Sequence, residues 1–383
     1  MIYLDNSATT KPYEEVLETF LKVSSSYFGN PSSLHSLGGN IEKLLEQARK
    51  QSASLLGVKG NEIFYTSGGT ESNNLALKGV ALHYQKRGKH IITSSIEHPS
   101  IKETCQQLEE HGFDITYLPV NSFGRINPDD VEAALRNDTI LVSIMHVNNE
   151  VGTVQPIKRI GELLADRPRT LFHVDHVQGV GKVPLDFYEC HIDLCSLSAH
   201  KFHGLKGTGL LFVKEGLKLS PLHSGGEQER RLRSGTENTG GIVSSAKALR
   251  LYLQEANEGR ERLRQLNSYV RKQLSEMEGI EIHSPDENIA PHIVNFSLLG
   301  LKGEVLVHAF EENDIYISTT SACSSKQKKP SSTLLAMGKS IEKADSAVRV
   351  SLSFHNTQKE MDTFINVLRH IQMKYANVIR RAK

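Results

Sequence analysis

Residues 62–118, EIFYTSGGTESNNLALKGVALHYQKRGKHIITSSIEHPSIKETCQQLEEHGFDITYL, decide the fold class of this chain. Short apolar runs in this stretch predict strands at 62–66, 90–94 and 114–118. The longer segments between them have the apolar spacing of amphipathic helices, at 71–86 and 100–110. Strands that alternate with helices indicate βαβ units, so the stretch predicts an α/β fold with a mostly parallel sheet.

The same alternation continues along the chain. Further apolar runs predict strands at 139–145, 170–174, 192–197 and 208–213, for a sheet of seven strands, with a helix at 128–135. After residue 240 the texture changes to a long charged helix at 244–277, strands near 290–297 and 346–352, and helices near 303–312 and 357–378. This change predicts a second, smaller α/β domain, with a boundary near residue 255.

The composition excludes several classes of protein. The 45 Lys and Arg balance 44 Asp and Glu to a formal charge of +1, whereas a nucleic-acid binder needs a concentrated basic surface. No window resembles a membrane helix, and the N-terminus MIYLDNSATT lacks the pattern of a secretory signal. The 4 cysteines form no CxxC pair and predict reduced thiols. We therefore expect a cytoplasmic protein that contacts neither membranes nor nucleic acid directly.

Three segments that follow expected strands contain residues suited to chemistry. Residues 66–72, TSGGTES, offer small residues and free N–H groups to an anion, although an ordinary capped helix start has the same pattern. Asp175 follows the strand at 170–174, at the edge where α/β sheets bind ligands, although a helix cap would also place a carboxylate there. Lys201 follows the strand at 192–197 and is a candidate Schiff-base nucleophile, although most lysines are surface residues.

One cysteine lies in a setting that suits a reactive thiol. Cys323 belongs to residues 321–330, SACSSKQKKP, a small, polar and basic segment that predicts an exposed loop. Three lysines favour its thiolate form, Lys326, Lys328 and Lys329. The remaining cysteines have the positions of buried filler residues, Cys105, Cys190 and Cys195.

Clustered histidines raise the alternative of a zinc hydrolase. His173 and His176 are three residues apart, as are His200 and His203, and imidazole groups bind zinc. On a strand, however, His173 and Asp175 share a face that His176 does not, and the chain has no HExxH motif. We therefore expect no metal site.

Ten segments, in order along nearly the whole chain, resemble the NifS/IscS-like cysteine desulfurases, a branch of the class V aminotransferases that use pyridoxal phosphate (PLP). They are YLDNSATT at 3–10, FGNPSSLH at 28–35, TSGGTESNN at 66–74, SIEHPSI at 95–101, MHVNNEVGTVQPI at 145–157, HVDHVQGVGK at 173–182, SAHKFHG at 198–204, RSGTEN at 233–238, SACSS at 321–325 and VRVSLS at 348–353. The resemblance implies fold type I of the PLP-dependent transferases. It places a large PLP-binding domain at 15–255 and a small domain, which carries the cysteine loop, at 1–14 and 256–383.

The resemblance implies roles around the cofactor. Lys201 would hold PLP covalently and later move protons at the substrate Cα. Asp175 would pair with the pyridinium nitrogen, and Gln178 would hydrogen-bond the phenolate oxygen. His98 would stack on the ring and take part in acid–base chemistry.

The resemblance also implies how the phosphate and the substrate are held. The phosphate would be bound by four residues of one subunit, Gly69, Thr70, Ser198 and His200. Thr236 would reach it from a second subunit, which implies a homodimer. Asn149 and Arg349 would bind the substrate carboxylate, Arg349 through its guanidinium fork. Without the resemblance, Arg349 would be interpreted as a surface arginine on a strand edge.

Cys323 would then accept the sulfur. The implied reaction converts L-cysteine to L-alanine and leaves a persulfide on Cys323, from which sulfur passes to an acceptor protein. The acceptor would be an iron–sulfur scaffold, a tRNA-thiolating enzyme or a thiamin-pathway protein. Two alternatives stay open: another class V PLP enzyme, such as a selenocysteine lyase or an aminotransferase, and a slow sulfur-relay scaffold that acts mainly by binding.

The chain departs from the usual family pattern at several positions: His176 in place of Ala, Ala199 in place of Gly, Leu205 in place of Pro, and Thr320 and Ser353 in place of Gly. None of these changes removes a reactive group. Thr320 precedes the Cys323 segment, and Ser353 follows Arg349 by four residues. We expect these two to affect rate and partner choice rather than the reaction class.

Overall fold

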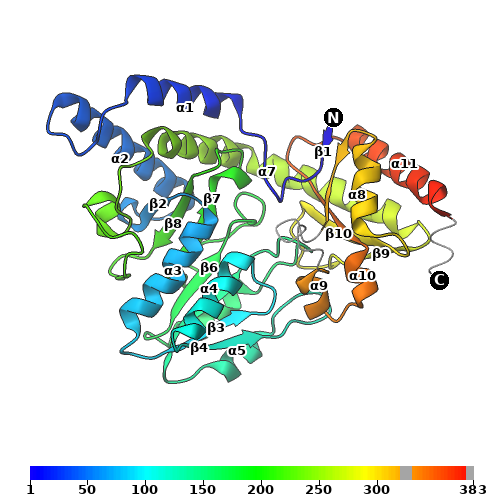
Figure 1. Cartoon of the computed structure of the whole chain (residues 1–383), viewed down its shortest axis with the longest axis horizontal. Helices are drawn as coiled ribbons and strands as arrows, with labels where there is room; N and C mark the ends of the chain where they lie inside the picture. Colours follow the sequence, from blue (N-terminus) through cyan, green and yellow to red (C-terminus); the bar gives the residue numbers. More distant parts are fainter. Residues whose placement is uncertain (320–329, 377–383) are drawn as a thin grey trace.

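The computed structural model describes residues 1–319 and 330–376. Its larger part contains a seven-stranded sheet in the spatial order β2-β8-β7-β6-β5-β3-β4 (Figure 1). The strands are β2 (Ile63–Thr66), β3 (His90–Ser94), β4 (Asp114–Leu118), β5 (Thr139–Met145), β6 (Leu171–Asp175), β7 (Leu194–Ser198) and β8 (Gly209–Val213). Neighbours pair in parallel except at β8, which is antiparallel to both β2 and β7. The predicted mostly parallel sheet of seven strands is confirmed.

Helices cover both faces of this sheet. Those of the larger part are α1 (Glu14–Ser26), α2 (Ser36–Leu56), α3 (Gly69–Tyr84), α4 (Pro99–Glu110), α5 (Pro128–Ala134), α6 (Ile157–Leu164) and the first turns of α7 (Thr239–Ser275). On one face, α3 and α4 share a core cluster with strand residues such as Phe64 and Leu141. On the other face, residues of α2, α6 and α7 cluster with the alternate strand residues Tyr65 and Val142. Burial of both faces explains why the strands are apolar along their whole length.

A smaller part is built on a four-stranded antiparallel sheet in the order β12-β13-β10-β9. Its elements are β9 (Ile280–Ile282), β10 (Ile293–Leu298), α8 (Gly303–Glu311), β11 (Ile315–Tyr316), β12 (Ser318–Thr319), α9 (Ser332–Ala336), α10 (Ile341–Asp345), β13 (Ala347–Ser351) and α11 (Gln358–Lys374). The N-terminal strand β1 (Ile2–Tyr3) pairs in parallel with β11. The first residues of the chain therefore lie beside its last third.

The long helix α7 connects the two parts. It has 37 residues and runs from the larger part into the smaller one (Figure 1). The side chain of Asn238 caps it by accepting the backbone N–H of Gly241 at 3.1 Å. A domain boundary near residue 255 would fall inside this continuous helix, so the division into 15–255 and the remaining segments stays a prediction.

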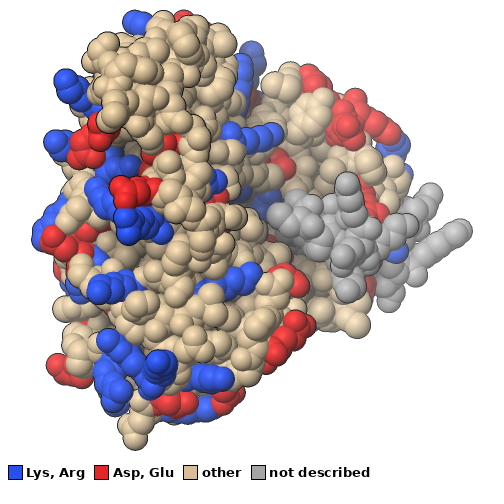
Figure 2. Space-filling model, turned by 60° about the vertical axis from the view of Figure 1, so that its left-hand side comes forward, with Lys and Arg blue, Asp and Glu red and all other residues tan. Residues whose placement is uncertain are grey.

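Helix hydropathy and surface charge both bear on what this chain can contact. Among residues 1–319 and 330–376, no helix is long and apolar enough to cross a membrane. On the face shown in Figure 2, Lys and Arg side chains are interspersed with Asp and Glu.

Close packing of α6 gives a testable requirement at Gly161. A Cβ at this position would lie 1.9 Å from the carbonyl oxygen of Cys190, a backbone atom held in the turn before β7. Gly161→Ala is therefore expected to lower the melting temperature by several degrees, since overpacking costs about 1–3 kcal/mol. Differential scanning calorimetry measures the change.

Gly39 of α2 provides the matched control. A Cβ there would meet nothing within 4 Å. Gly39→Ala should therefore raise the melting temperature, because Ala in a helix is favoured over Gly by about 0.5–1 kcal/mol. A Gly161→Ala variant as stable as the Gly39→Ala variant would contradict the packing argument.

Candidate active site

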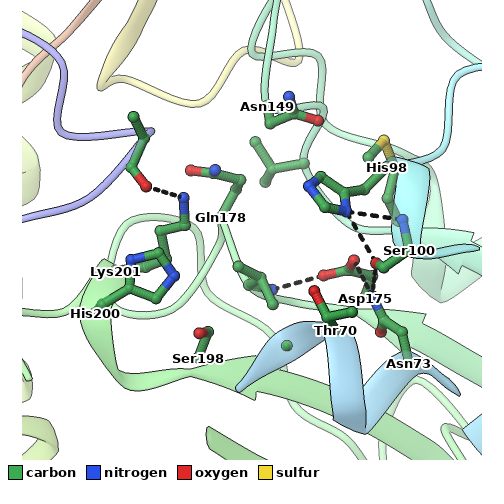
Figure 3. A pocket seen from close by; sticks show the side chains of 15 residues that line it. Thr70, Asn73, His98, Ser100, Asn149, Asp175, Gln178, Ser198, His200 and Lys201 are labelled. Carbon is green, nitrogen blue, oxygen red and sulfur yellow. Dashed lines mark hydrogen bonds between the residues drawn. The ribbon is translucent and has the colours of Figure 1, made fainter. Parts of the chain in front are cut away.

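A pocket opens where the carboxyl ends of parallel strands meet at one edge of the large sheet (Figure 3). Its lining residues are Ala8, Gly69, Thr70, Asn73, His98, Ser100, Met145, Val147, Asn149, Asp175, Val177, Gln178, Ser198, His200 and Lys201. Most of them end or follow β2, β3, β5, β6 or β7, and open α/β sheets bind ligands at this edge. Among the predicted site residues that the structure describes, the pocket therefore brings together all except Thr236 and Arg349.

Lys201 enters the pocket from a short 3-10 helix, Ala199–Lys201, that directly follows β7. Its amine donates to the carbonyl oxygen of Ala8 at 2.7 Å and also to that of Ser7. Both acceptors belong to the N-terminal segment. The segment YLDNSATT thus positions the amine of Lys201.

Asp175 is the last residue of β6, and its carboxylate lies at the base of the pocket. Asn73 of α3 donates its amide to one carboxylate oxygen at 2.8 Å, and the backbone N–H of Val177 donates to the other at 3.0 Å. These two bonds fix the carboxylate while leaving it in contact with the pocket. A fixed negative charge here favours a positively charged group bound in front of it.

His98 faces the pocket as the N-cap residue of α4. Its Nδ1 accepts the backbone N–H of Ser100 at 3.1 Å. Burial lowers the pKa of His98, although the nearby Asp175 opposes this shift. Because Nδ1 accepts a hydrogen bond, the neutral form of the ring carries its proton on Nε2, the nitrogen that does not contact Ser100 (Figure 3).

The start of α3 forms a cradle suited to an anion. Gly68 has φ +151°, which a side chain would disfavour, and it turns the chain from β2 into the helix. The backbone N–H groups of Gly69 and Thr70 lie in the first turn of α3, at the positive end of the helix dipole. Ser198 and His200 line the same pocket, and burial lowers the pKa of His200 to about 4.

Two buried amide oxygens of the pocket have no hydrogen-bond partner among the described residues, Gln178 Oε1 and Asn73 Oδ1. The Gln178 amide nitrogen donates instead to the carbonyl oxygen of Ser7 at 3.0 Å. Buried polar atoms rarely stay unpaired in proteins. These orphaned atoms therefore point to a polar ligand that fills the pocket.

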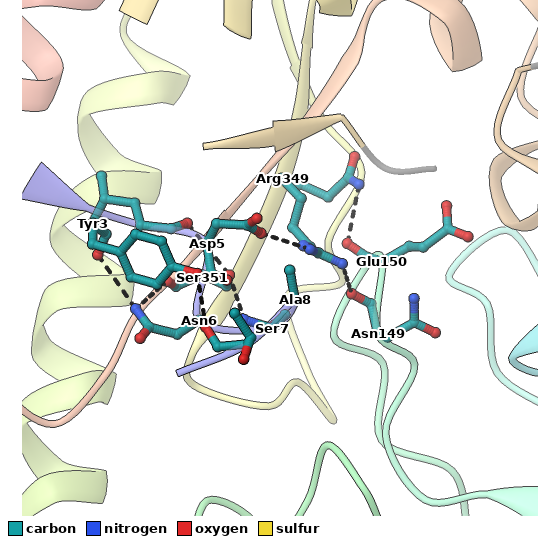
Figure 4. Close-up of polar contacts among 12 residues, drawn as sticks. Tyr3, Asp5, Asn6, Ser7, Ala8, Asn149, Glu150, Arg349 and Ser351 are labelled. Atoms are coloured by element: carbon teal, nitrogen blue, oxygen red, sulfur yellow. Dashed lines mark hydrogen bonds and ion pairs between the residues drawn. The ribbon is translucent and has the colours of Figure 1, made fainter. Parts of the chain in front are cut away.

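Arg349 does not line the pocket, but it lies beside Asn149, which does (Figure 4). It is 2% exposed on β13, which is flanked by β10 and β12, so its interpretation as a surface residue on a strand edge is wrong. The guanidinium donates to Asp5 Oδ1 and to the carbonyl oxygen of Asn149, each at 2.8 Å. Its buried Nε has no partner within 1–319 and 330–376. Arg349 contacts the backbone of Asn149, and the side chain of Asn149 lines the pocket. The two residues are therefore adjacent, as the predicted shared carboxylate site requires.

One further described residue of the predicted site, Thr236, is not in this pocket. Thr236 is exposed and lines a separate cavity near Ser67 and Arg233, so its contact with a phosphate of a second subunit stays a prediction. Cys323 and Thr320 lie outside the described residues.

The histidines do not form a metal centre in the described part of the chain. His173 is buried and contacts the hydroxyl groups of Ser143 and Ser196 at 2.8 and 3.0 Å. His176 pairs with His146 at 2.8 Å between their Nδ1 atoms. Each of these rings therefore has a hydrogen-bond partner within the protein.

Sequence reasoning missed several residues that support the site. Asn73 and Ser100 hold Asp175 and His98, and Asp5 pairs with Arg349. Asn73 follows Gly69 by four residues, which places it on the same helical face. A polar residue on that face was the available signal.

Glu97, next to His98, provides a prediction about pH and stability. It is 3% exposed, accepts the backbone N–H of Met145 at 3.0 Å, and burial raises its pKa to about 8. The Glu97 carboxyl therefore keeps its proton in the folded state up to about pH 8, whereas in the unfolded state it loses the proton near pH 4.5. As a result, the free energy of unfolding falls as pH rises from about 5 to 8. Glu97→Gln should remove this loss of stability, which is on the order of 5 kcal/mol at most.

The measurement is the melting temperature of both proteins at several pH values between 5 and 9. The advantage of Glu97→Gln over the wild type should grow with pH. Glu103→Gln, at an exposed position of α4, is the control and should show no such growth. A difference independent of pH would show that the raised pKa is not the cause.

Similarity to known proteins extends over nearly the whole chain. The model of the class V aminotransferase family matches residues 2–364. A NifS/IcsS protein homolog of Lactobacillus delbrueckii subsp. bulgaricus is 51% identical, with 99% of each chain covered. The cysteine desulfurase IscS of Methanosarcina thermophila is 43% identical, covering 98% of this chain and 93% of the relative.

Solved structures show the same fold. A NifS-like protein superposes with a TM-score of 0.92 at 38% identity, covering 97% of this chain and 99% of its own. The structure of SspA in complex with cysteine gives a TM-score of 0.81 at 35% identity, covering 93% and 100%. Enzymes of this family use PLP, which agrees with the expected cofactor. The chain therefore belongs to the class V aminotransferase family and, within it, to the NifS/IscS group of cysteine desulfurases.

Proposed function

We propose that this chain removes the sulfur of L-cysteine, releases L-alanine, and holds the sulfur as a persulfide on Cys323 for delivery to an acceptor protein. The observation that carries the proposal is the pocket, where the amine of Lys201 lies together with Asp175 and His98 at the carboxyl edge of the sheet. Membership of the NifS/IscS group supports this reading. So does the relative SspA, whose structure was solved in complex with cysteine.

The residues of the pocket fit PLP. Lys201 supplies the amine that holds its carbonyl carbon, and the fixed carboxylate of Asp175 suits a protonated ring nitrogen. The start of α3 at Gly69 and Thr70 suits the phosphate, together with Ser198 and His200. The buried Oε1 of Gln178, which has no partner among the described residues, supports a polar ligand beside this amide, and rotation of the amide would present its nitrogen to the phenolate oxygen.

PLP, when bound, withdraws electrons from the Cα of an attached amino acid. The chain then has to hold the substrate and move protons. Asn149, which lines the pocket, and the adjacent Arg349, whose Nε has no partner among the described residues, would together bind the substrate carboxylate. Lys201 moves the proton at Cα, and the neutral ring of His98 lies in the same pocket to give or take a second proton.

Sulfur transfer requires Cys323. Its thiolate attacks the substrate sulfur, and an S–S bond forms while the Cβ–S bond breaks. The electron pair of the broken bond stays on carbon, where a proton completes alanine. The sulfur then leaves Cys323 when an acceptor thiolate attacks the persulfide.

The biological setting is part of the same proposal. The acceptor is an iron–sulfur scaffold, a tRNA-thiolating enzyme or a thiamin-pathway protein, and in the second case the partner holds the RNA. The enzyme acts as a cytoplasmic homodimer, in which Thr236 of each subunit reaches the phosphate of the other.

Removal of the Lys201 amine tests the cofactor site. Lys201→Ala should lose the visible absorbance of covalently held PLP and more than 99% of alanine release, since a positioned acid–base group contributes about 10²–10⁴-fold. Spectrophotometry and an amino-acid assay measure these outcomes. Lys206→Ala, at an exposed position nearby, is the control and should retain both. Alanine release that survives in Lys201→Ala would exclude the proposed role.

Substitution of the proposed nucleophile separates the desulfurase from its alternatives. Cys323→Ser should keep the PLP absorbance and the binding of cysteine but form no protein persulfide from radiolabelled cysteine. Cys105→Ala removes a buried thiol of α4 and should still form the persulfide. Unchanged turnover in Cys323→Ser would favour a selenocysteine lyase or an aminotransferase. Negligible alanine release by the wild type, with acceptor binding intact, would favour a sulfur-relay scaffold.

A further inference from the structure

The segment that contains Cys323, residues 320–329, lies outside the described residues, but the chain is described on both sides of it. Before it, β12 pairs with β13, and Ser318 lies opposite Arg349. After it, Ser331 is the N-cap residue of α9, and its hydroxyl oxygen accepts the backbone N–H of Leu334 at 3.1 Å. A chain of given length has a maximum reach, so the positions of these two ends limit how far the thiol can lie from either.

Glu150 holds the second of these ends. The hydroxyl of Thr333 donates to its Oε1 at 2.9 Å, and the hydroxyl of Ser331 donates to its Oε2. Ser331 and Thr333 are 1% and 2% exposed. Buried hydroxyl groups need hydrogen-bond partners, and this carboxyl group supplies the partner for both. The start of α9 is therefore fixed on the side chain of Glu150.

Glu150 also belongs to the loop that presents Asn149 to the pocket (Figure 4). The side chain of Asn149 lines the pocket, and its carbonyl oxygen accepts the guanidinium of Arg349 at 2.8 Å. The carbonyl oxygen of Glu150 accepts the side-chain amide of Asn295, on β10, at 3.1 Å. The Cys323 segment thus begins opposite Arg349 and ends on the chain neighbour of Asn149. These are the two residues proposed to bind the substrate carboxylate.

We propose that Glu150 is a positioning residue for sulfur transfer, because it fixes the end of the Cys323 segment beside the loop of Asn149. The thiolate has to meet the substrate sulfur, and a small misplacement of reacting groups slows a reaction strongly. A fixed return point lowers the entropy that the segment loses when the thiolate approaches. Glu150 does not itself line the pocket, so it acts through Ser331 and Thr333. The inference rests on the proposed role of Cys323 as the sulfur acceptor.

Thr333 allows this contact to be removed with little change of shape. Thr333→Val keeps the volume but lacks the hydroxyl, whereas Thr333→Ser keeps the hydroxyl. Glu150→Gln keeps the length of the side chain but has one acceptor oxygen in place of two. Ser332→Ala is the matched control, since Ser332 is exposed in the same turn and its hydroxyl contacts Lys102 instead. Ser331 is left unchanged because its hydroxyl oxygen also caps α9.

Three measurements follow the contact, the substrate and the transfer separately. Hydrogen–deuterium exchange of a peptide that covers 331–337, in the cofactor-free protein, shows whether α9 stays fixed. The cysteine concentration that gives half of the change in PLP absorbance reports substrate binding. The rate at which radiolabelled cysteine, at a saturating concentration, forms the persulfide on Cys323 in a single turnover reports the transfer.

We expect Thr333→Val and Glu150→Gln to exchange faster in α9 and to form the persulfide about tenfold more slowly, as the loss of one buried hydrogen bond predicts. The half-saturating cysteine concentration should stay within about twofold of the wild-type value. Thr333→Ser and Ser332→Ala should behave as the wild type does. The double variant should be no slower than Glu150→Gln alone, because both changes break the same contact.

Persulfide formation at the wild-type rate in folded Thr333→Val and Glu150→Gln proteins would overturn the inference. Slower formation without faster exchange in α9, or equal slowing in Ser332→Ala, would overturn it as well. Circular dichroism and melting temperature identify a variant that fails to fold, and the other variant then decides the question. Failure of the proposed function looks different, because no persulfide would then form on Cys323 in any of these proteins, the wild type included.

Discussion

The burial of the Arg349 guanidinium is the constraint on which the arrangement of the site depends. A buried charge is tolerated when it is paired and hydrogen-bonded, and removal of one partner of such a pair costs about 3–5 kcal/mol. Arg349 on β13 finds its partners in Asp5 and in the carbonyl oxygen of Asn149, each at 2.8 Å. The N-terminal segment and the loop after β5 must therefore both meet the smaller sheet. Ser7 and Ala8 follow Asp5 and accept the amine of Lys201, so this contact also sets the position of the lysine.

Most of the larger sheet could be predicted because its strands are buried on both faces and its crossovers are amphipathic helices. The antiparallel direction of β8 was missed, although its signal was present. Only ten residues separate Ser198 at the end of β7 from Gly209 at the start of β8, which is too few for a parallel crossover. The pairing of β1 with β11, by contrast, could not be predicted from the sequence. Strands of two residues carry no periodicity, and their pairing depends on contacts between distant segments.

The site was predictable to the extent that its residues follow strands. Asp175, His98 and Lys201 all lie just beyond apolar runs, so the rule that parallel strands bind ligands at their carboxyl ends applies to them. Asp5 could not be found in this way. It is a partly buried charged residue whose position depends on a partner from the other end of the chain, Arg349. Periodicity places a residue on a face but does not show which charges that face will meet.

Two positions that depart from the family pattern, His176 and Ser353, are accommodated by contacts with residues outside the pocket. His176 does not line the pocket; its ring is paired with His146 and packs edge-on against Phe187, with 6.2 Å between the ring centroids. Its space depends on Gly179, where a Cβ would lie 2.5 Å from the ring.

Ser353 is satisfied in the same local way. Its backbone N–H and its hydroxyl both donate to Asn356 Oδ1, at 2.8 and 3.3 Å, and neither contacts Arg349. Ser353 is therefore accommodated within its own turn, and His176 by the residue that follows β5. The groups that face the pocket keep their positions because those positions are fixed by other bonds, from Asn73, Val177 and the N-terminal carbonyls.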